Sequence, residues 1–151
     1  MANRVETSLS TELQTYLQQE RYVAVSTVDH ETGGPAVRAI SWVYAIGDKQ
    51  IRFSIDNRSR LVEDIKANDQ IVLTVICKGS TYAISGRGRI FEEKMSDVPI
   101  KLALIETEVI EVRDIMFYGG KMTAEPDYEK MYDAEAAAKL DSQVMNALKR
   151  A

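Results

Sequence analysis

Six short segments with β-strand character follow one another through the chain, and this series limits the possible folds more than any other feature. The segments are rich in apolar and β-branched residues, and several alternate apolar with polar positions, as half-buried strands do. The predicted strands are 22–28, 36–46, 50–55, 70–77, 81–91 and 102–112. Their number and close spacing predict a mainly β fold of the α+β kind, an antiparallel barrel with helices outside it. Because the side chains of a small barrel fill its interior, we expect the functional surface on the outer wall or at a subunit interface.

Segments with helical periodicity flank these strands. Leu9 and Leu13 lie on one face of a first helix, for which Ser8 is the predicted N-cap. A second, short helix is predicted within 57–68 with Ser59 as its N-cap, and a third follows in the C-terminal region.

Two irregularities are predicted within the strands. Gly86 and Gly88 lie inside a strand, where glycine indicates a bend or a close approach of another backbone. The inward-facing set of the last strand switches near Val109 and Ile110, which predicts a β-bulge there.

Composition narrows the classes of function. A chain of 151 residues, 45% of them hydrophobic, is expected to form one domain, 1–151. No apolar run reaches the length of a transmembrane helix, and the polar start lacks the pattern of a signal peptide, so we expect a cytoplasmic protein. The net charge of −4 argues against nucleic acid as a partner.

Few side chains suggest catalysis by the protein alone. Cys77 lies in an apolar strand and is predicted to be a buried core thiol, and His30 lies in an acidic turn and is predicted to be solvated. Glu106, Glu108 and Glu111 are spread along a strand and are predicted to face solvent. With one cysteine and one histidine, the chain offers no multi-cysteine metal site. An enzyme of this sequence would therefore depend on a cofactor.

Two arginines flank the predicted start of the second helix. Arg58 and Arg60 stand on either side of Ser59, where the helix dipole disfavours cations unless an anion lies between them. A phosphate group would satisfy both the guanidinium groups and the exposed N–H groups of the helix start. The alternative interpretation is that Ser59 is only an N-cap and both arginines are solvated.

A further arginine lies on the second predicted strand. Strand alternation places Arg38 on one face with Ile40, Trp42 and Tyr44, where it would bind a phosphate or the polar edge of a flat ring system. The alternative is an arginine at the strand end whose aliphatic stem covers apolar surface.

Taken together, several short motifs resemble a known family. In chain order they are Thr27-Val28-Asp29, Arg38-Ala39-Ile40, Phe53-Ser54, Ser59-Arg60 and Ser85-Gly86-Arg87-Gly88-Arg89. Their order and spacing over about residues 9–118 resemble the pyridoxamine 5′-phosphate oxidase-like family of flavin-binding split barrels, and most closely its small general-stress members.

This resemblance implies a six-stranded antiparallel split β-barrel with flanking helices, and a homodimer that holds FMN in two symmetric sites at its interface. It also implies an FMN-dependent oxidoreductase that uses a small-molecule electron donor or acceptor. The cofactor-binding residues that it implies are Arg38, Ala39, Ile40, Ser41, Phe53, Ser54, Arg58, Ser59, Arg60 and Thr81.

The sequence departs from the family pattern in two places. Leu61 stands where the family usually has a lysine, so that the phosphate is held more weakly or Arg58 replaces the lysine. The C-terminal helical extension, 119–151, ends in an alanine-rich tail, Tyr128–Ala151, without tryptophan. It does not match the arginine- and tryptophan-bearing tail that holds the substrate phosphate in true pyridoxamine phosphate oxidases. We therefore do not expect pyridoxamine phosphate to be the substrate.

Two functions of different classes stay open at this point. The first is an FMN-dependent oxidoreductase, and the second is a non-catalytic binding protein or stress sensor for a flavin or another cofactor. Relatives of this fold also bind haem or a deazaflavin, so that the cofactor itself is open.

Overall fold

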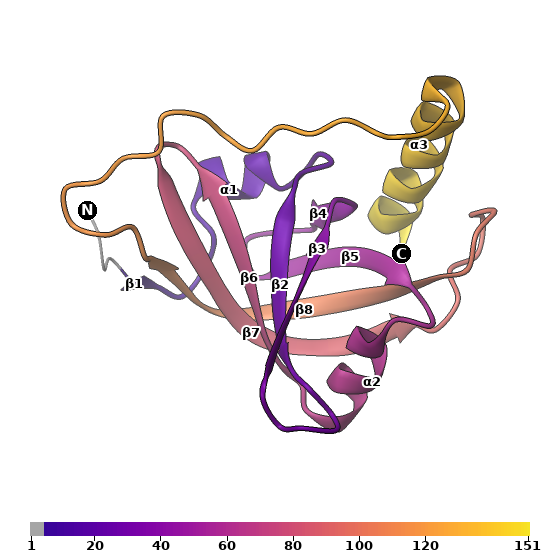
Figure 1. Ribbon diagram of the computed structural model, residues 1–151, viewed down its shortest axis with the longest axis horizontal. Helices are drawn as coiled ribbons and strands as arrows, with labels where there is room; N and C mark the ends of the chain where they lie inside the picture. The colour runs from indigo at the N-terminus through magenta and orange to yellow at the C-terminus, as the bar shows by residue number, and fades with distance from the viewer. Residues whose placement is uncertain (1–4) are drawn as a thin grey trace.

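Antiparallel strands form the central sheet of the computed structural model, which describes residues 5–151 (Figure 1). The strands are β1 (Val5–Glu6), β2 (Val23–Val28), β3 (Pro35–Ile40), β4 (Val43–Ala45), β5 (Gln50–Asp56), β6 (Gln70–Cys77), β7 (Ser80–Glu92) and β8 (Leu102–Asp114). The helices are α1 (Thr11–Tyr16), α2 (Arg60–Ala67) and α3 (Ala134–Arg150). β3 and β4 together form the predicted strand 36–46, so that with the two-residue β1 set aside, the described chain has the six main strands expected.

The two ends of the curled sheet are linked by one stretch of chain that changes partners. The strand order is β3-β2-β6-β7-β8-β5-β4, so β3 and β4 lie at opposite ends of the sheet although only two residues separate them. The carbonyl of Ser41 accepts a hydrogen bond from the Arg21 N–H on the β2 side (3.0 Å), and the carbonyl of Trp42 accepts one from the Ser54 N–H of β5 (3.1 Å). The structure is therefore a curled antiparallel half-barrel with flanking helices, a split barrel as predicted.

The same break corrects one prediction about side-chain faces. Ile40 and Val43 both belong to the barrel core, whereas Trp42 and Tyr44 belong to a second apolar cluster on the outer side. Arg38 therefore does not lie on one continuous face with Trp42 and Tyr44. The alternation fails because the two residues between β3 and β4 lie outside the ladder and reverse the faces.

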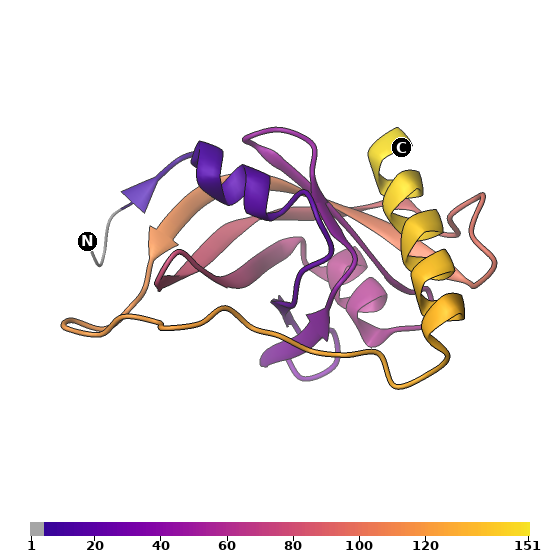
Figure 2. The same ribbon diagram turned by 90° about the horizontal axis from the view of Figure 1, so that it is seen from above.

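A second, smaller core lies beneath α3 at one end of the molecule (Figures 1 and 2). Val144 and Leu148 of α3 are fully buried there together with Leu104 of β8. The Trp42 ring packs partly buried against this cluster, and its Nε1–H donates to Asp141 of α3 (2.8 Å). The C-terminal extension runs along the molecule from the β1 end before it turns into α3 (Figure 1). Trp42 thus packs within a single chain.

Both predicted irregularities are present. Ser85 pairs with Glu111 and Gly86 pairs with Val109, which leaves Ile110 as the extra residue of a bulge. At Gly86 a Cβ atom would overlap the carbonyl oxygen of Glu108, so this position requires glycine for the close approach of β7 and β8.

The helix starts agree with the sequence in one case and differ in the other. Ser59 caps α2, since its hydroxyl accepts a hydrogen bond from the Leu61 N–H (3.2 Å). α1 is capped by Ser10, whose hydroxyl accepts from the Leu13 N–H (3.1 Å), and not by Ser8 as predicted. Two serines precede this helix, and the second has the extended backbone that a cap requires. Along residues 5–151, none of the helices has the length and apolar character that a bilayer crossing demands.

Candidate functional site

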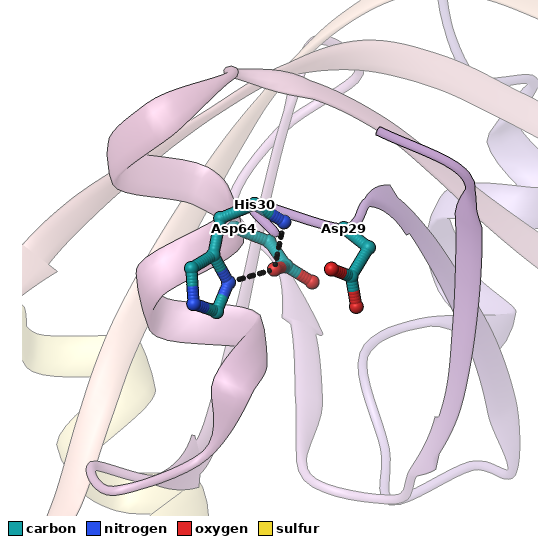
Figure 3. A group of neighbouring side chains, drawn as sticks. All are labelled: Asp29, His30 and Asp64. Carbon is teal, nitrogen blue, oxygen red and sulfur yellow. Dashed lines mark hydrogen bonds and ion pairs between the residues drawn. The ribbon is translucent and has the colours of Figure 1, made fainter. Parts of the chain in front are cut away.

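The start of α2 lies against the turn that joins β2 to β3, and a buried carboxylate holds the two together (Figure 3). Asp64 of α2 is fully buried. Its carboxylate accepts hydrogen bonds from the Thr27 hydroxyl (2.8 Å), the His30 backbone N–H (2.9 Å) and His30 Nδ1 (2.7 Å). Burial by itself would raise the pKa of Asp64, but the hydrogen bonds from His30 and Thr27 outweigh it and hold this pKa below its usual value.

His30 is exposed as a whole residue, as predicted, but its ring is not free in solvent. Its side chain is 26% exposed and is tied through Nδ1 to Asp64. Local sequence gave no signal for this contact, because the two residues are 34 positions apart. The histidine thus fixes the β2–β3 turn on α2.

Asp29 joins this group, which by composition resembles a metal site. The ligand atoms of Asp29, His30 and Asp64 lie within 4.8 Å of one another (Figure 3). However, Asp29 already accepts hydrogen bonds from the backbone N–H groups of Glu31 (2.8 Å) and Thr32 (3.0 Å), and the Asp64 oxygens are occupied as described. The group is satisfied by protein donors and serves to shape the turn.

Both arginines at the start of α2 are paired with carboxylates of the same chain. Arg60 Nη2 lies 3.0 Å from Asp29, and Arg60 Nη1 lies 2.6 Å from Glu31. Arg58 contacts Asp56 through Nε (3.2 Å) and Nη2 (3.1 Å). The backbone N–H groups of the turn and the Arg60 side chain together lower the pKa of Asp29 well below its usual range.

The burial of position 61 explains why it holds a leucine and not the lysine usual in the family. The Leu61 side chain is fully buried in the barrel core. A lysine there would have to leave the core or bury its charge. The second residue of α2 is therefore used for packing, and its neighbours Arg58 and Arg60 are the cations left at this helix start.

The four predicted residues around the end of β3 have different surroundings. Arg38 is half-buried opposite the core residue Val25, and its guanidinium makes no hydrogen bond or ion pair within residues 5–151. Ile40 is buried in the core, Ala39 is exposed, and the Ser41 hydroxyl donates to Glu20 (3.3 Å). β3 pairs only with β2, so the backbone groups on its other edge are outside the sheet ladder.

Phe53 and Ser54 of β5 point to opposite sides of the sheet. Phe53 is fully buried in the barrel core. Ser54 lies opposite Leu104, on the side that α3 covers, and its buried hydroxyl oxygen has no partner within the described chain. Within one chain, then, Phe53 is occupied by core packing and Ser54 faces the α3 cluster.

Thr81 is remote from the other predicted residues. It stands near the start of β7, where its hydroxyl contacts the Met116 sulfur (3.9 Å). α2 contacts the same strand at Gly88, since a Cβ atom there would lie 3.1 Å from Ile65. Seven residues of extended strand separate these two points, roughly 23 Å. One chain does not bring Thr81 to the start of α2.

Sequence reasoning missed a charge cluster around a buried carboxylate on the outer wall. Glu106 was predicted to face solvent, but it is buried and paired with Arg52 (3.0 Å) and Arg89 (2.7 Å). Burial would raise the pKa of Glu106, yet its two arginine partners outweigh this and lower it. Arg52 also donates to the carbonyls of Leu148 and Ala151 and so anchors the end of α3. By contrast, Cys77 is buried as predicted, and burial raises the pKa of its thiol to about 11.

The curled antiparallel sheet and its flanking helices define a split-barrel protein. Comparison with known proteins supports this fold. The sequence model of the pyridoxamine 5′-phosphate oxidase family matches residues 9–114. The chain therefore belongs to this family. No curated protein matches the sequence significantly.

Solved structures show the same fold at low sequence identity. A candidate pyridoxamine 5′-phosphate oxidase from Lactobacillus delbrueckii has a TM-score of 0.62 and 16% identity, over 74% of this chain and 98% of that one. General Stress Protein 26 from Bacillus anthracis has a TM-score of 0.52 and 16% identity, over 63% and 84%. HutZ, the haem storage protein from Vibrio cholerae, has a TM-score of 0.51 and 11% identity, over 70% and 94%.

Proposed function

We propose that the protein binds FMN and acts as an FMN-dependent oxidoreductase on a small molecule other than pyridoxamine phosphate. The observation that carries this proposal is the pair of exposed arginines at the capped start of α2, in a chain that belongs to a family named for an oxidase. The Arg58 side chain is 83% exposed and the Arg60 side chain 47%. Both guanidinium groups are accessible to a phosphate at the positive end of the helix dipole.

The predicted residues on β3 have chemical groups that suit a flavin. Arg38 offers a half-buried guanidinium without a partner in the described chain, as a site for an anionic or polar ligand edge would. The free edge of β3 offers backbone N–H and C=O groups that a flavin ring edge would contact. In this arrangement Arg58 and Arg60 would bind the phosphate, and Arg38 to Ser41 would orient the ring.

The flavin itself would supply the redox chemistry, as a hydride acceptor. The chain's part is to bind and orient the flavin and to keep water from its ring. His30 Nδ1 is held by Asp64, which keeps the histidine and its turn in place beside Arg60. In this proposal the described residues bind and orient the cofactor.

The C-terminal region supports a substrate other than pyridoxamine phosphate. Residues 119–151 contain no tryptophan, and their arginine, Arg150, pairs with Asp97 (3.3 Å). α3 is anchored to the barrel wall through Asp141 and the end of the helix. This region therefore covers the barrel and does not offer the arginine- and tryptophan-bearing tail of the true oxidases.

A non-catalytic cofactor-binding protein is the second candidate. It is favoured by the contacts of the charged side chains near α2, because Asp29, Asp64, Arg58 and Arg60 are all engaged in pairs and none is poised as a general acid or base. The structural likeness to a haem storage protein supports the fold alone and leaves the cofactor to experiment.

Reconstitution separates these candidates. The purified chain is titrated with FMN, riboflavin and haem, and binding is followed by flavin fluorescence or haem absorbance. FMN binding with the two flavin bands near about 370 and 450 nm supports the proposal. Steady-state reduction of bound FMN by NADH or NADPH supports the oxidoreductase over the binding protein. Binding of haem but not of FMN would overturn the proposed cofactor.

A further inference from the structure

Arg60 is held from two directions by the β2–β3 turn. Its Nη2 faces both oxygens of Asp29 (3.0 and 3.2 Å), and its Nη1 faces Glu31 Oε1 (2.6 Å). Both terminal nitrogens of the guanidinium are thus engaged by carboxylates. These are the nitrogens that a phosphate would bind in a bidentate contact.

The two carboxylates differ in how firmly they are held. The Asp29 side chain is 16% exposed and accepts two backbone hydrogen bonds within its own turn. The Glu31 side chain is 63% exposed, and its carboxylate contacts Arg60 alone among the described residues. Glu31 can therefore swing into solvent, whereas Asp29 would have to give up two backbone hydrogen bonds to do so.

The turn as a whole is also fixed to the helix. Asp64 binds the backbone N–H and the ring of His30, the residue between Asp29 and Glu31 (Figure 3). This buried anchor positions the backbone of the turn and so places Asp29 and Glu31 beside Arg60. A third carboxylate, Asp56, holds Arg58 in the same region. Three carboxylates face two guanidinium groups, which is an unfavourable balance for an incoming dianion.

We propose that the β2–β3 turn is a built-in competitor for the cofactor phosphate: Glu31 occupies Arg60 in the unloaded protein and is displaced when a phosphate-bearing flavin binds. This inference rests on the proposed function. It adds that the turn sets the affinity for the phosphate group, with Asp29 as the fixed part and Glu31 as the releasable part. The protein should therefore favour the phosphorylated flavin over riboflavin less strongly than it would without Glu31.

The test compares FMN with riboflavin, which lacks the phosphate, in the full-length chain. Glu31→Gln removes the competing charge from an exposed side chain. We expect it to tighten FMN binding about 2- to 5-fold, the range of an exposed ion pair, with a larger gain at low salt. Riboflavin affinity should not change. Glu93→Gln is the matched control, because Glu93 is an exposed carboxylate paired with Lys66 on the same helix (2.8 Å).

A double-variant cycle identifies Arg60 as the route of the effect. In the Arg60→Ala background, Glu31→Gln should bring much less gain, because the competitor acts through this guanidinium. Thermal unfolding of each apo variant verifies that the fold is kept.

Each outcome decides the question. Tighter FMN binding that is absent for riboflavin and reduced without Arg60 supports the competitor. If the parent binds FMN and Glu31→Gln binds it equally well, the proposal that the turn competes with the phosphate is wrong, while the proposed function stands. Equal tightening for riboflavin also overturns it, because the phosphate is then not involved. If no variant binds FMN, the proposed function fails, and the competitor fails with it.

Discussion

At the scale of single residues, Arg60 is the side chain on which the proposed cofactor site depends most. We expect Arg60→Ala to weaken FMN binding roughly 10- to 100-fold, because a charge-assisted contact with a dianion is lost and Asp29 and Glu31 are left unpaired beside it. Flavin fluorescence during titration of the apo protein measures this. The fold should survive, since the side chain is half exposed at the start of a helix.

Two further variants, a control and a comparison, help to interpret the Arg60→Ala result. Lys66→Ala, in the last turn of the same helix, should leave FMN binding unchanged. Arg58→Ala should weaken binding as much as Arg60→Ala if Arg58 replaces the lysine absent at Leu61, and less if it only neighbours the site. An Arg60→Ala protein that binds FMN as tightly as the parent would show that the phosphate lies elsewhere.

Protonation of Asp64 in acid should destabilise the fold. Its pKa is lowered in the folded protein from an ordinary value of 3.8, so its carboxylate stabilises the fold above that pH, and this contribution is lost as the pH falls through the folded pKa. Asp64→Asn should cost about 1–3 kcal/mol at neutral pH, and the difference from the parent should shrink in acid.

Urea unfolding of both proteins between about pH 7 and about pH 2 measures this difference. The matched control is Asp69→Asn, which removes an exposed carboxylate paired with Arg87 and should have little effect at any pH. A parent–variant difference that stays constant into acid would mean that Asp64 does not stabilise the fold through its charge.

At the scale of elements, most of the architecture was readable from the sequence. Strand positions followed from alternation, and the bulge at Ile110 followed from the switch of its inward set. The break at Ser41 and Trp42 was not readable, because both residues suit a strand and only the tertiary change of partner from β2 to β5 interrupts it. Ser59 was placed correctly at the start of α2, whereas two nearby serines made the start of α1 ambiguous.

The candidate site was less predictable for a related reason. The positions of Arg58, Ser59 and Arg60 follow from local sequence, but the partner of Arg60 is Asp29, 31 residues earlier in the chain. Short patterns locate charged residues, and the sheet topology decides which of them meet. Asp64 was unremarkable in the sequence for the same reason, although it anchors the whole turn.

α3 is docked on the barrel, and its release should be detectable in the fluorescence of Trp42. Leu148 is fully buried between the helix and β8, so Leu148→Ala should destabilise the docked state by about 2–5 kcal/mol. Trp42 is the only tryptophan and packs against α3, so its emission should shift to the red as the helix loosens. Lys139→Ala, on the exposed side of α3, is the control. Unchanged stability and emission in Leu148→Ala would contradict this docking.

At the scale of the whole molecule, the position of Thr81 bears on the proposed homodimer. Thr81 lies about seven strand residues, roughly 23 Å, from the place where β7 meets α2. If Thr81 and Arg60 contact the same flavin, they must come from different chains. Exposed apolar side chains such as Val37 (64% exposed) and Phe117 (71%) offer surface for a second copy. Sedimentation should therefore give twice the 17.0 kDa mass of the chain, and a stable monomer at micromolar concentration would contradict the dimer.

Mixing two defective variants tests the shared site directly. Arg60→Ala and Thr81→Val should each bind FMN weakly as homodimers, because each damages both sites. In a heterodimer, one site carries both defects and the other carries neither, so mixing should restore parent-like binding at half of the heterodimer's sites. Sites built within single chains would show no such recovery, since each chain would keep its own defect. FMN titration of the mixture, after sedimentation has shown that chains exchange, measures the recovered fraction. Thr81→Val homodimers that bind FMN as tightly as the parent would place Thr81 outside the cofactor site.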